Sequence, residues 1–293
     1  MPDAAAQTSP DRPPAAFRLG MSAPGVLVTS TLIVFALALV VFLSFRVNDG
    51  SLLGTGFTLD NFVNIVGDPL SWIVILRSLG IAGLVTLATV VTAFPVAYYL
   101  AFHAGKRRGL ILFLVTLPFW TSYLLRVFAW KIVLAYNGVL NSALVGSGIT
   151  AEPTLAFLNT PAAVIVTLAH AYAPFAILPI YVALETIPKS LTEAASDLGA
   201  RPWTAFRRVI LPNAMPGVLA AALVVFVPTV GDYVTPAMVG GPSSTMIGSM
   251  IQAQFGKAND WPFGAALAVC VMLVILALVL IARAADRRYG RRA

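Results

Sequence analysis

The chain has 293 residues, of which 59% are hydrophobic and 11% are charged, and its mean hydropathy is +0.87. Soluble domains are about 45–50% apolar and about 25% charged, so this composition excludes a water-soluble globule. The formal net charge is +7, and the single cysteine, Cys270, excludes an internal disulfide and a cysteine-based metal cluster.

Six stretches of the sequence are long and apolar enough to cross a bilayer, whose core requires about 20 residues of helix. The predicted spans are residues 25–45, 72–102, 109–134, 162–184, 215–240 and 262–284. The first span exceeds the about 7–15 residues of a signal-peptide core, so we expect it to be retained. Residues 1–24, rich in Ala and Pro, are predicted to be a disordered cytoplasmic tail. The chain is therefore predicted to be an all-α polytopic protein with one transmembrane domain, residues 25–284.

The positive-inside rule orients these spans. Fourteen Lys and Arg residues fall before the first span, between spans two and three, between spans four and five, and after the last span. In the alternate loops only Arg46 and Lys257 occur. We therefore predict that both termini are cytoplasmic, including a basic tail at 285–293. Because topology accounts for the basic charge, it gives no indication of nucleic-acid binding.

Interior prolines mark spans two to five. A proline inside a helix frees a carbonyl group and kinks the helix, and such breaks are tolerated in membranes where they line a cavity or a protein interface. This pattern favours gating helices, with ordinary membrane-helix prolines as the alternative. Around Asp232 the prolines are predicted to break span five. The prolines are Pro95, Pro118, Pro174, Pro179, Pro228 and Pro236.

Arg126 and Asp232 lie inside predicted spans, where ionisable residues are functional candidates. Each lies about 26 Å along its helix from the cytoplasmic end, at about 1.5 Å per residue. Both are therefore predicted in the outer half of the bilayer. We hypothesise that they form an ion pair that opens when a solute arrives. A purely structural pair, or Arg126 snorkelling alone, is the alternative.

The sequence contains no recognisable catalytic motif. Its two Gly-Lys pairs, at Gly105 and Gly256, lack the upstream glycine and the following Ser or Thr of a phosphate-binding loop. Neither His-Glu-x-x-His nor Gly-x-Ser-x-Gly is present. We therefore predict no catalytic residue, no metal ligand and no cofactor bound by this chain, and no ATP hydrolysis by it.

The cytoplasmic segment between spans four and five is predicted to form two short helices. Ser190-x-x-Glu193 is a capping-box pattern that starts the first helix. Gly199 suits the left-handed backbone position that ends a helix. Pro202 fits the first turn of the second helix, and Pro212 is expected to stop it.

The first of these helices carries an apolar face formed by Leu191, Ala194, Ala195 and Leu198. A helix of about this length is marginal in water, so its apolar face must pack against something. The membrane surface or the protein's own bundle is one possibility, and a groove in a cytoplasmic partner is the other. The residues alone leave both open.

The pattern Glu193-Ala194-Ala195-x-x-x-Gly199, followed by Leu211-Pro212, resembles the "EAA" loop in the membrane subunits of binding-protein-dependent ABC importers. The resemblance covers spans two to six and implies the type I importer permease fold. Val209 replaces the usual Ile ahead of Leu-Pro. By resemblance, residues 185–214 are the coupling loop that docks on an ATPase. The implied coupling residues are Glu193, Ala194, Ala195, Leu198, Gly199, Leu211 and Pro212.

Within that family the chain is most similar to the spermidine/putrescine-type permeases, through segments 118–126, 138–141, 240–248 and 260–264. The resemblance implies a bacterial inner-membrane permease subunit with a second permease subunit, two copies of an ABC ATPase that binds ATP and Mg, and a periplasmic solute-binding protein. A polyamine is the expected solute. An importer of another small solute (iron, a phosphonate, an opine or an amino-acid-like compound) and a secondary transporter driven by an ion gradient remain alternatives.

The predicted substrate pathway combines the two ionisable residues with aromatic residues at comparable depth. Aromatic rings can contact a polyamine chain through cation–π and apolar interactions. Packing at the membrane interface is the alternative role for these rings. The predicted pathway residues are Asp232, Arg126, Trp120, Tyr123 and Tyr233.

Overall fold

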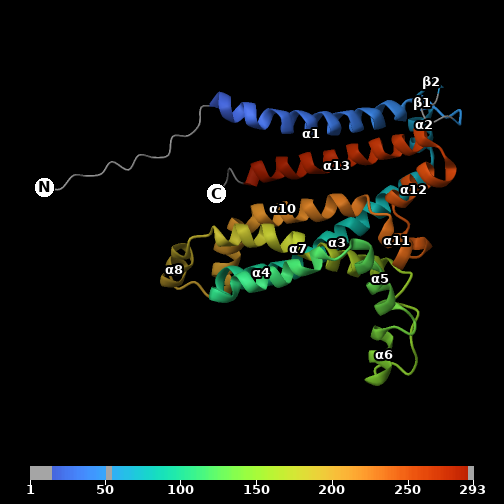
Figure 1. Ribbon diagram of the computed structural model, residues 1–293. Helices are drawn as coiled ribbons and strands as arrows, with labels where there is room; N and C mark the ends of the chain where they lie inside the picture. Colours follow the sequence, from blue (N-terminus) through green and yellow to red (C-terminus); the bar gives the residue numbers. More distant parts are fainter. Residues whose placement is uncertain (1–14, 51–54, 290–293) are drawn as a thin grey trace.

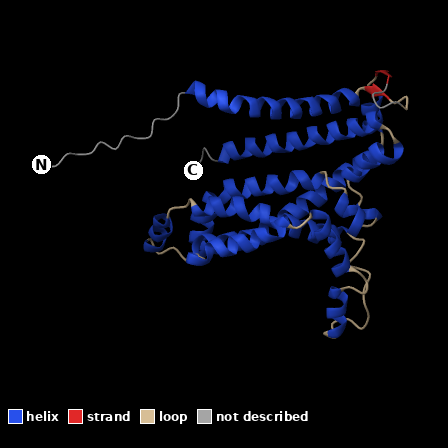
Figure 2. Cartoon of the chain, in the orientation of Figure 1, coloured by secondary structure: helices blue, strands red, loops and turns tan. Residues whose placement is uncertain are grey.

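The computed structural model describes residues 15–50 and 55–289, so residues 1–14 and 290–293 of the two predicted tails lie outside the described part. The backbone of residues 15–24, which we predicted to be disordered, forms the first turns of helix α1 (Ala15–Ser44). After α1, β1 (Arg46–Val47) pairs antiparallel with β2 (Thr55–Phe57). Figure 2 shows this small hairpin at one end of a structure that is otherwise helical in its described part.

Six helical segments of the described chain are long and apolar enough to cross a membrane, as predicted. Four of them agree closely with predicted spans. These are Gly25–Ser44 within α1, α3 (Pro69–Phe102), α7 (Pro161–Glu185), and Trp261–Leu280 within α13 (Trp261–Tyr289).

The third predicted span, residues 109–134, is wrong as a single helix. Helix α4 (Arg108–Thr116) passes into a 3-10 turn at Leu117–Trp120, and the chain is then extended until α5 (Tyr123–Leu134) begins. The physical reason is Pro118, which has no N–H to continue the helical bonding. The long apolar segment in this region is instead Tyr123–Gly146, which includes α5 and α6 (Val139–Gly146).

The fifth span has the predicted break at Asp232. Helix α10 (Leu211–Val230) ends immediately before Gly231, and α11 (Val234–Val239) begins two residues after Asp232. The prediction that the break lies at this residue is therefore confirmed.

The predicted stop at Pro212 is wrong, because helix α9 (Pro202–Ala205) continues through a π-turn at Phe206–Ile210 into α10. The π-turn shifts the hydrogen-bond register, so that the N–H of Leu211 donates to the carbonyl of Phe206. The side-chain amide of Asn213 donates to the carbonyl of Val209 at 2.7 Å. Pro212 then lies in the first turn of α10, where its missing N–H is tolerated, and the helix continues.

Helices α3, α7 and α10 pack against one another and form the centre of the molecule, with α4 beside them (Figure 1). Their contact surface is rich in small residues. A Cβ on Gly217 of α10 would collide with the side chain of Ala183 and the carbonyl of Pro179 in α7, so only glycine permits this close approach. A second buried cluster joins the first half of α3 to α12 (Ile247–Ala253) and α13.

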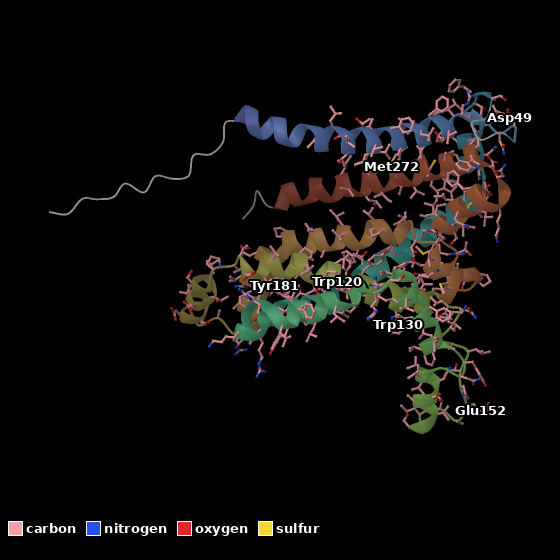
Figure 3. All side chains as sticks on the ribbon, in the orientation of Figure 1. Asp49, Trp120, Trp130, Glu152, Tyr181 and Met272 are labelled. Atoms are coloured by element: carbon pink, nitrogen blue, oxygen red, sulfur yellow. The ribbon has the colours of Figure 1, made fainter. Side chains whose placement is uncertain are left out.

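Figure 1 shows two opposite ends of the helix bundle. The start of α1, the last turns of α13, and α8 (Lys189–Asp197) lie at one end. Helix α2 (Asp60–Gly67), α11 and α12 lie at the other end. Helix α6 projects away from the bundle, and Figure 3 shows Glu152 on the loop after it. Helix α1 packs mainly on α13 and is otherwise little buried.

Candidate functional site

Helix α8 does not begin with the predicted capping box. Pro188 occupies the cap position with an extended backbone and makes no side-chain cap hydrogen bond. Because the fixed φ of proline suits a helix start, α8 begins at Lys189 and takes Ser190 into its first turn. The prediction that Ser190 and Glu193 form the cap is wrong, and Glu193 instead lies exposed on the helix surface.

The end of α8 confirms the prediction for Gly199, which has φ +76°. Its N–H donates to the carbonyl of Ser196 at 2.9 Å, and the N–H of Ala200 donates to Ala195 at 3.0 Å. This pair of bonds is the Schellman motif that closes a helix C-terminus. Nothing lies within 4 Å of a Cβ added at Gly199, so the backbone conformation, and not lack of space, requires glycine.

The apolar face of α8 is left open by the described chain. Leu198 is 88% exposed and Leu191 is 44% exposed, and Trp203 in α9 is 70% exposed nearby along the chain. Helix α8 packs against α9 and the following π-turn, while the ring of Trp203 stacks on Phe206 at 5.3 Å. Sequence reasoning missed Trp203, although a tryptophan after Arg201-Pro202 in a cytoplasmic loop was a visible signal.

The other loop positions fall into two groups. Ala194 is exposed on α8, whereas Ala195 is partly covered and accepts the hydrogen bond that closes the helix. Leu211 and Pro212 lie where the π-turn joins α10, with Leu211 partly buried. The structure thus separates an exposed face on α8 from a rigid connection into α10.

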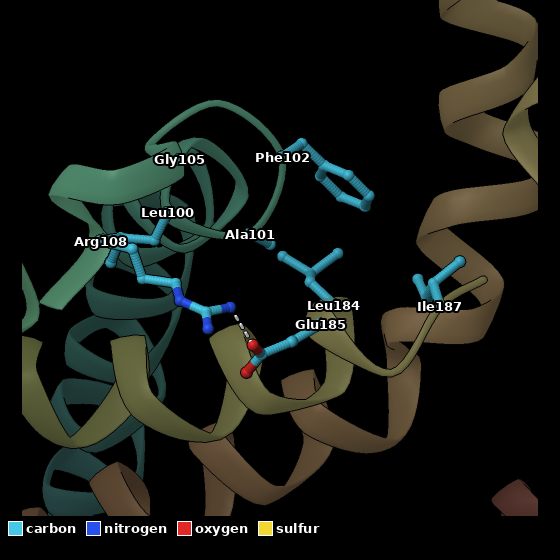
Figure 4. Close-up of a pocket in the computed structure, with 8 residues that line it drawn as sticks. All are labelled: Leu100, Ala101, Phe102, Gly105, Arg108, Leu184, Glu185 and Ile187. Carbon is cyan, nitrogen blue, oxygen red and sulfur yellow. Dashed lines mark hydrogen bonds and ion pairs between the residues drawn. The ribbon is translucent and has the colours of Figure 1, made fainter. Parts of the chain in front are cut away.

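An ion pair between Arg108 and Glu185 lies at the base of this loop (Figure 4). It joins the start of α4 to the end of α7 and borders a pocket of about 310 Å³. Both side chains are half-exposed, so the pair is worth at most about 1 kcal/mol. Sequence reasoning missed it because the partners are 77 positions apart. The pocket is lined by Leu100, Ala101, Phe102, Gly105, Arg108, Leu184, Glu185 and Ile187.

At the opposite end of the bundle, Asp232 holds the start of α11. Its carboxylate, in a side chain only 8% exposed, accepts the N–H groups of Val234 at 3.2 Å and Thr235 at 3.3 Å. The hydroxyl of Tyr123 in α5 donates to the same carboxylate at 2.9 Å and lies 2.6 Å from the hydroxyl of Thr235. A buried carboxylate requires such donors, and here they tie α5 to α11.

The hypothesised ion pair between Arg126 and Asp232 is wrong, since within the described part of the chain Arg126 has no carboxylate within salt-bridge distance. Its guanidinium donates to the backbone carbonyl of Ala171 in α7 at 2.9 Å and lies 5.8 Å from the centre of the Tyr123 ring. Among the described residues, the buried Nε atom of Arg126 has no hydrogen-bond partner. One helical turn separates Tyr123 from Arg126, so α5 directs the arginine to α7 while the tyrosine reaches Asp232.

The remaining predicted pathway residues are more open. Trp120, labelled in Figure 3, is 82% exposed on the 3-10 turn after α4. Tyr233 is half-exposed and lines a hollow of about 420 Å³ together with Gln252 and Phe255. Trp130 in α5 donates its indole N–H to Nδ1 of His170 in α7 at 3.1 Å. Tyr123 thus contacts both Asp232 and Arg126, whereas Trp120 and Tyr233 present free ring surface.

Comparison with known proteins agrees with this architecture. Residues 93–291 match the family described as "Binding-protein-dependent transport system inner membrane component". The spermidine/putrescine transport system permease protein PotB of Escherichia coli (strain K12) is 38% identical over 245 residues, covering 84% of this chain and 88% of that protein. PotB of Haemophilus influenzae is 36% identical over 270 residues, covering 91% of this chain and 94% of that protein.

A solved structure shows the same fold. A chain from the crystal structure of a bacterial ABC transporter involved in the import of alginate superimposes with a TM-score of 0.66 at 20% sequence identity. The match covers 92% of this chain and 99% of that chain. With the family match extending over more than half of its length, the chain belongs to the binding-protein-dependent transport system inner membrane components, the permease subunits of ABC importers.

Proposed function

We propose that this chain is the non-catalytic permease subunit of an ATP-driven polyamine importer and receives its solute from a periplasmic binding protein. The observation that carries this proposal is the identity of 36–38% to spermidine/putrescine permeases over most of both chains. Its complex contains a second permease subunit and two copies of an ABC ATPase, which binds ATP and Mg.

The exposed face of α8 supports an ATPase partner. Leu198 exposes most of its side chain in a helix too short to be stable alone, so burying it in a groove of the ATPase removes apolar surface from water. Closure of the two ATPases then displaces α8. Because α9, the π-turn and α10 form 29 continuous helical residues from Pro202 to Val230, this displacement reaches the break at Asp232, about 40 Å away.

The predicted pathway residues support a cationic solute. Asp232 supplies a negative charge, and the exposed rings of Trp120 and Tyr233 offer surfaces for cation–π contacts with ammonium groups. Arg126 turns away to Ala171, which leaves the carboxylate free of a competing arginine. An alkyl chain bearing several ammonium groups matches this combination of charge and apolar ring surface.

The proposed solute is tested by uptake into proteoliposomes that contain the complete importer. The lumen, which corresponds to the cytoplasm, holds ATP, and the binding protein is added outside. Labelled spermidine is expected to accumulate, and excess putrescine is expected to compete with it, whereas a phosphonate or an amino acid is not. Accumulation of one of the latter solutes, with no spermidine uptake, would reassign the importer to another small solute.

We propose that the end of the bundle carrying α8 faces the cytoplasm of a bacterial inner membrane, together with both termini. Cysteine labelling tests this orientation. In a Cys270→Ala background, and in membranes without the ATPase, Leu198→Cys at the C-cap of α8 and Leu155→Cys after α6 each place one thiol at a position at least 78% exposed. A membrane-impermeant maleimide is expected to label Leu155→Cys in right-side-out vesicles and Leu198→Cys in inside-out vesicles.

The background protein without cysteine is the control, and it is expected to remain unlabelled in both preparations. The opposite labelling pattern would show that the proposed orientation is inverted.

A further inference from the structure

A compact segment follows the break in span five and closes the end of the bundle opposite α8 (Figure 1). We name residues 231–258 the outer strap. It contains α11, a 3-10 turn at Pro242–Ser244, α12, and a π-turn at Gln254–Ala258. The outer strap contacts α3, α5, α7 and α13, so it ties together helices from both halves of the sequence.

Two adjacent residues of α3 hold the middle of the outer strap. Ser78 accepts the backbone N–H of Ile247 on its hydroxyl oxygen at 2.7 Å, and donates that hydroxyl to the carbonyl of Val74 at 2.7 Å. Arg77 donates to the carbonyl of Pro242 at 3.2 Å. Ser78 and Ile247 are both fully buried. The outer strap is therefore bonded to α3 on both sides of the segment that precedes α12.

Ser78 provides α12 with a cap that its own sequence lacks. The cap position of α12 is Met246, which makes no side-chain cap hydrogen bond and has no oxygen to offer. The first N–H groups of a helix have no partner within the helix, and a buried N–H without an acceptor is unfavourable. The hydroxyl of Ser78, from a different helix, accepts the first of these N–H groups, that of Ile247.

The start of α12 lies directly against the break that carries Asp232. A Cβ added to Gly248 would collide with the carbonyl of Gly231 and lie 3.0 Å from the carbonyl carbon of Asp232. The backbone of α12 at Gly248 therefore packs directly on the backbone of Gly231 and Asp232, so a shift of α12 toward the break would displace them. Ser78 is thus linked to Asp232 by its hydrogen bond to Ile247 and by the packing of the next residue, Gly248, on the backbone of Asp232.

The strap is fixed on α7 by similar close contacts. A Cβ on Gly240 would come within 3.0 Å of the side chain of Val164, and one on Gly241 would collide with the carbonyl of Asn159. The N–H of Asn159 donates to the carbonyl of Val239 at 2.9 Å. These contacts explain why Gly240 and Gly241 are glycines. In the described part of the chain, the hydrogen bond from Ile247 to Ser78 is a buried polar link between α12 and α3.

We infer that Ser78 is a positioning residue for transport. By capping α12, it holds Asp232 in a fixed position relative to α3. This inference rests on the proposed pathway role of Asp232. When α3 moves during alternating access, the outer strap and Asp232 move with it, and the carboxylate keeps its place relative to the pathway.

The matched variants are Ser78→Ala and Thr89→Ala in the assembled importer. Both residues are fully buried in α3 and donate to a carbonyl one turn earlier, at 2.7 Å for Ser78 and 2.6 Å for Thr89. Ser78 differs in also accepting an N–H from the outer strap. Ser78→Thr keeps the hydroxyl and is the conservative rescue.

The first readout is hydrogen exchange of peptides from residues 244–252, which needs no solute. Ser78→Ala is expected to speed exchange there at least tenfold, and Thr89→Ala is expected to leave it within twofold of the wild type. Unchanged exchange in Ser78→Ala would overturn the inference, whatever solute the importer carries.

The second readout is the initial rate of labelled spermidine uptake. Ser78→Ala is expected to lower the maximal rate at least fivefold, Ser78→Thr to recover most of it, and Thr89→Ala to retain it. In an Asp232→Asn background, adding Ser78→Ala is expected to change the rate less than twofold, because Ser78 acts through Asp232.

Faster exchange with full uptake, or a further fivefold loss in the double variant, would show that Ser78 is structural only. If the wild type takes up no spermidine, the proposed function fails, and the exchange comparison still decides whether Ser78 holds the outer strap.

Discussion

Replacing Gly199 with aspartate is expected to leave the protein in the membrane and to reduce ATP-driven uptake about tenfold or more. A side chain at φ +76° costs about 1–2 kcal/mol, and a negative charge at a helix C-terminus costs about a further 0.3–1 kcal/mol. Since about 1.4 kcal/mol is a factor of ten in an equilibrium, the loop would leave its docking conformation in most molecules. Uptake and ATP hydrolysis by the purified complex measure this loss of coupling.

Two variants separate the causes of that effect. Gly199→Asn has the same shape and the same tolerance of positive φ as aspartate but no charge, so it is expected to keep the backbone cost, lose the charge cost, and retain more uptake than Gly199→Asp. Gly109→Asp introduces the same charge at an exposed glycine without positive φ, in the first turn of α4, where a carboxylate is favourable. Equal uptake by Gly199→Asp and Gly109→Asp would contradict the role assigned to the end of α8.

Replacing Asp232 with alanine is expected to abolish most uptake and to lower the unfolding temperature of the purified protein. Three donors would lose their acceptor: the hydroxyl of Tyr123 and the N–H groups of Val234 and Thr235. A buried unsatisfied donor costs about 1–3 kcal/mol. Asp232→Asn keeps a carbonyl acceptor but removes the charge, so it is expected to preserve more stability than transport.

Asp260 provides the matched control because it also accepts a backbone N–H at a helix start, that of Phe263 at 3.1 Å, and is only partly exposed. Asp260→Ala is expected to cost about 1 kcal/mol, as for other lost helix caps, and to leave uptake close to the wild type. If Asp232→Ala and Asp260→Ala transport equally well, Asp232 has no part in the pathway.

Features that depend on length, hydropathy and local backbone preference were predictable from the sequence. Length and hydropathy predict four of the spans. Local backbone preference predicts the break at Asp232 and the helix end at Gly199. The interior proline Pro118 indicated a kink in the third span, but the bounds 109–134 followed hydropathy alone, which runs on through the break. The helix continued through Pro212 because a π-turn shifts the register and leaves the proline in the first turn of α10, which the sequence pattern did not indicate.

Partners distant in sequence were beyond prediction. Counting residues along each helix placed Arg126 and Asp232 at the same depth in the membrane. Such a count does not determine how each helix is rotated about its axis. In the structure the arginine points to the carbonyl of Ala171 instead. The bond from Ser78 to Ile247 spans 169 positions, and nothing in the local pattern of either residue marks it. Such contacts depend on how the helices pack, which a periodic pattern in one segment does not specify.

Co-purification from membranes, followed by reconstitution, tests most directly whether this permease is coupled to an ATPase through α8. The wild-type chain is expected to bring an ABC ATPase with it, and the reconstituted complex is expected to accumulate solute with ATP and without an ion gradient. The Gly199→Asp complex is expected to lose that uptake. A chain that purifies alone and accumulates solute on an ion gradient would contradict the account.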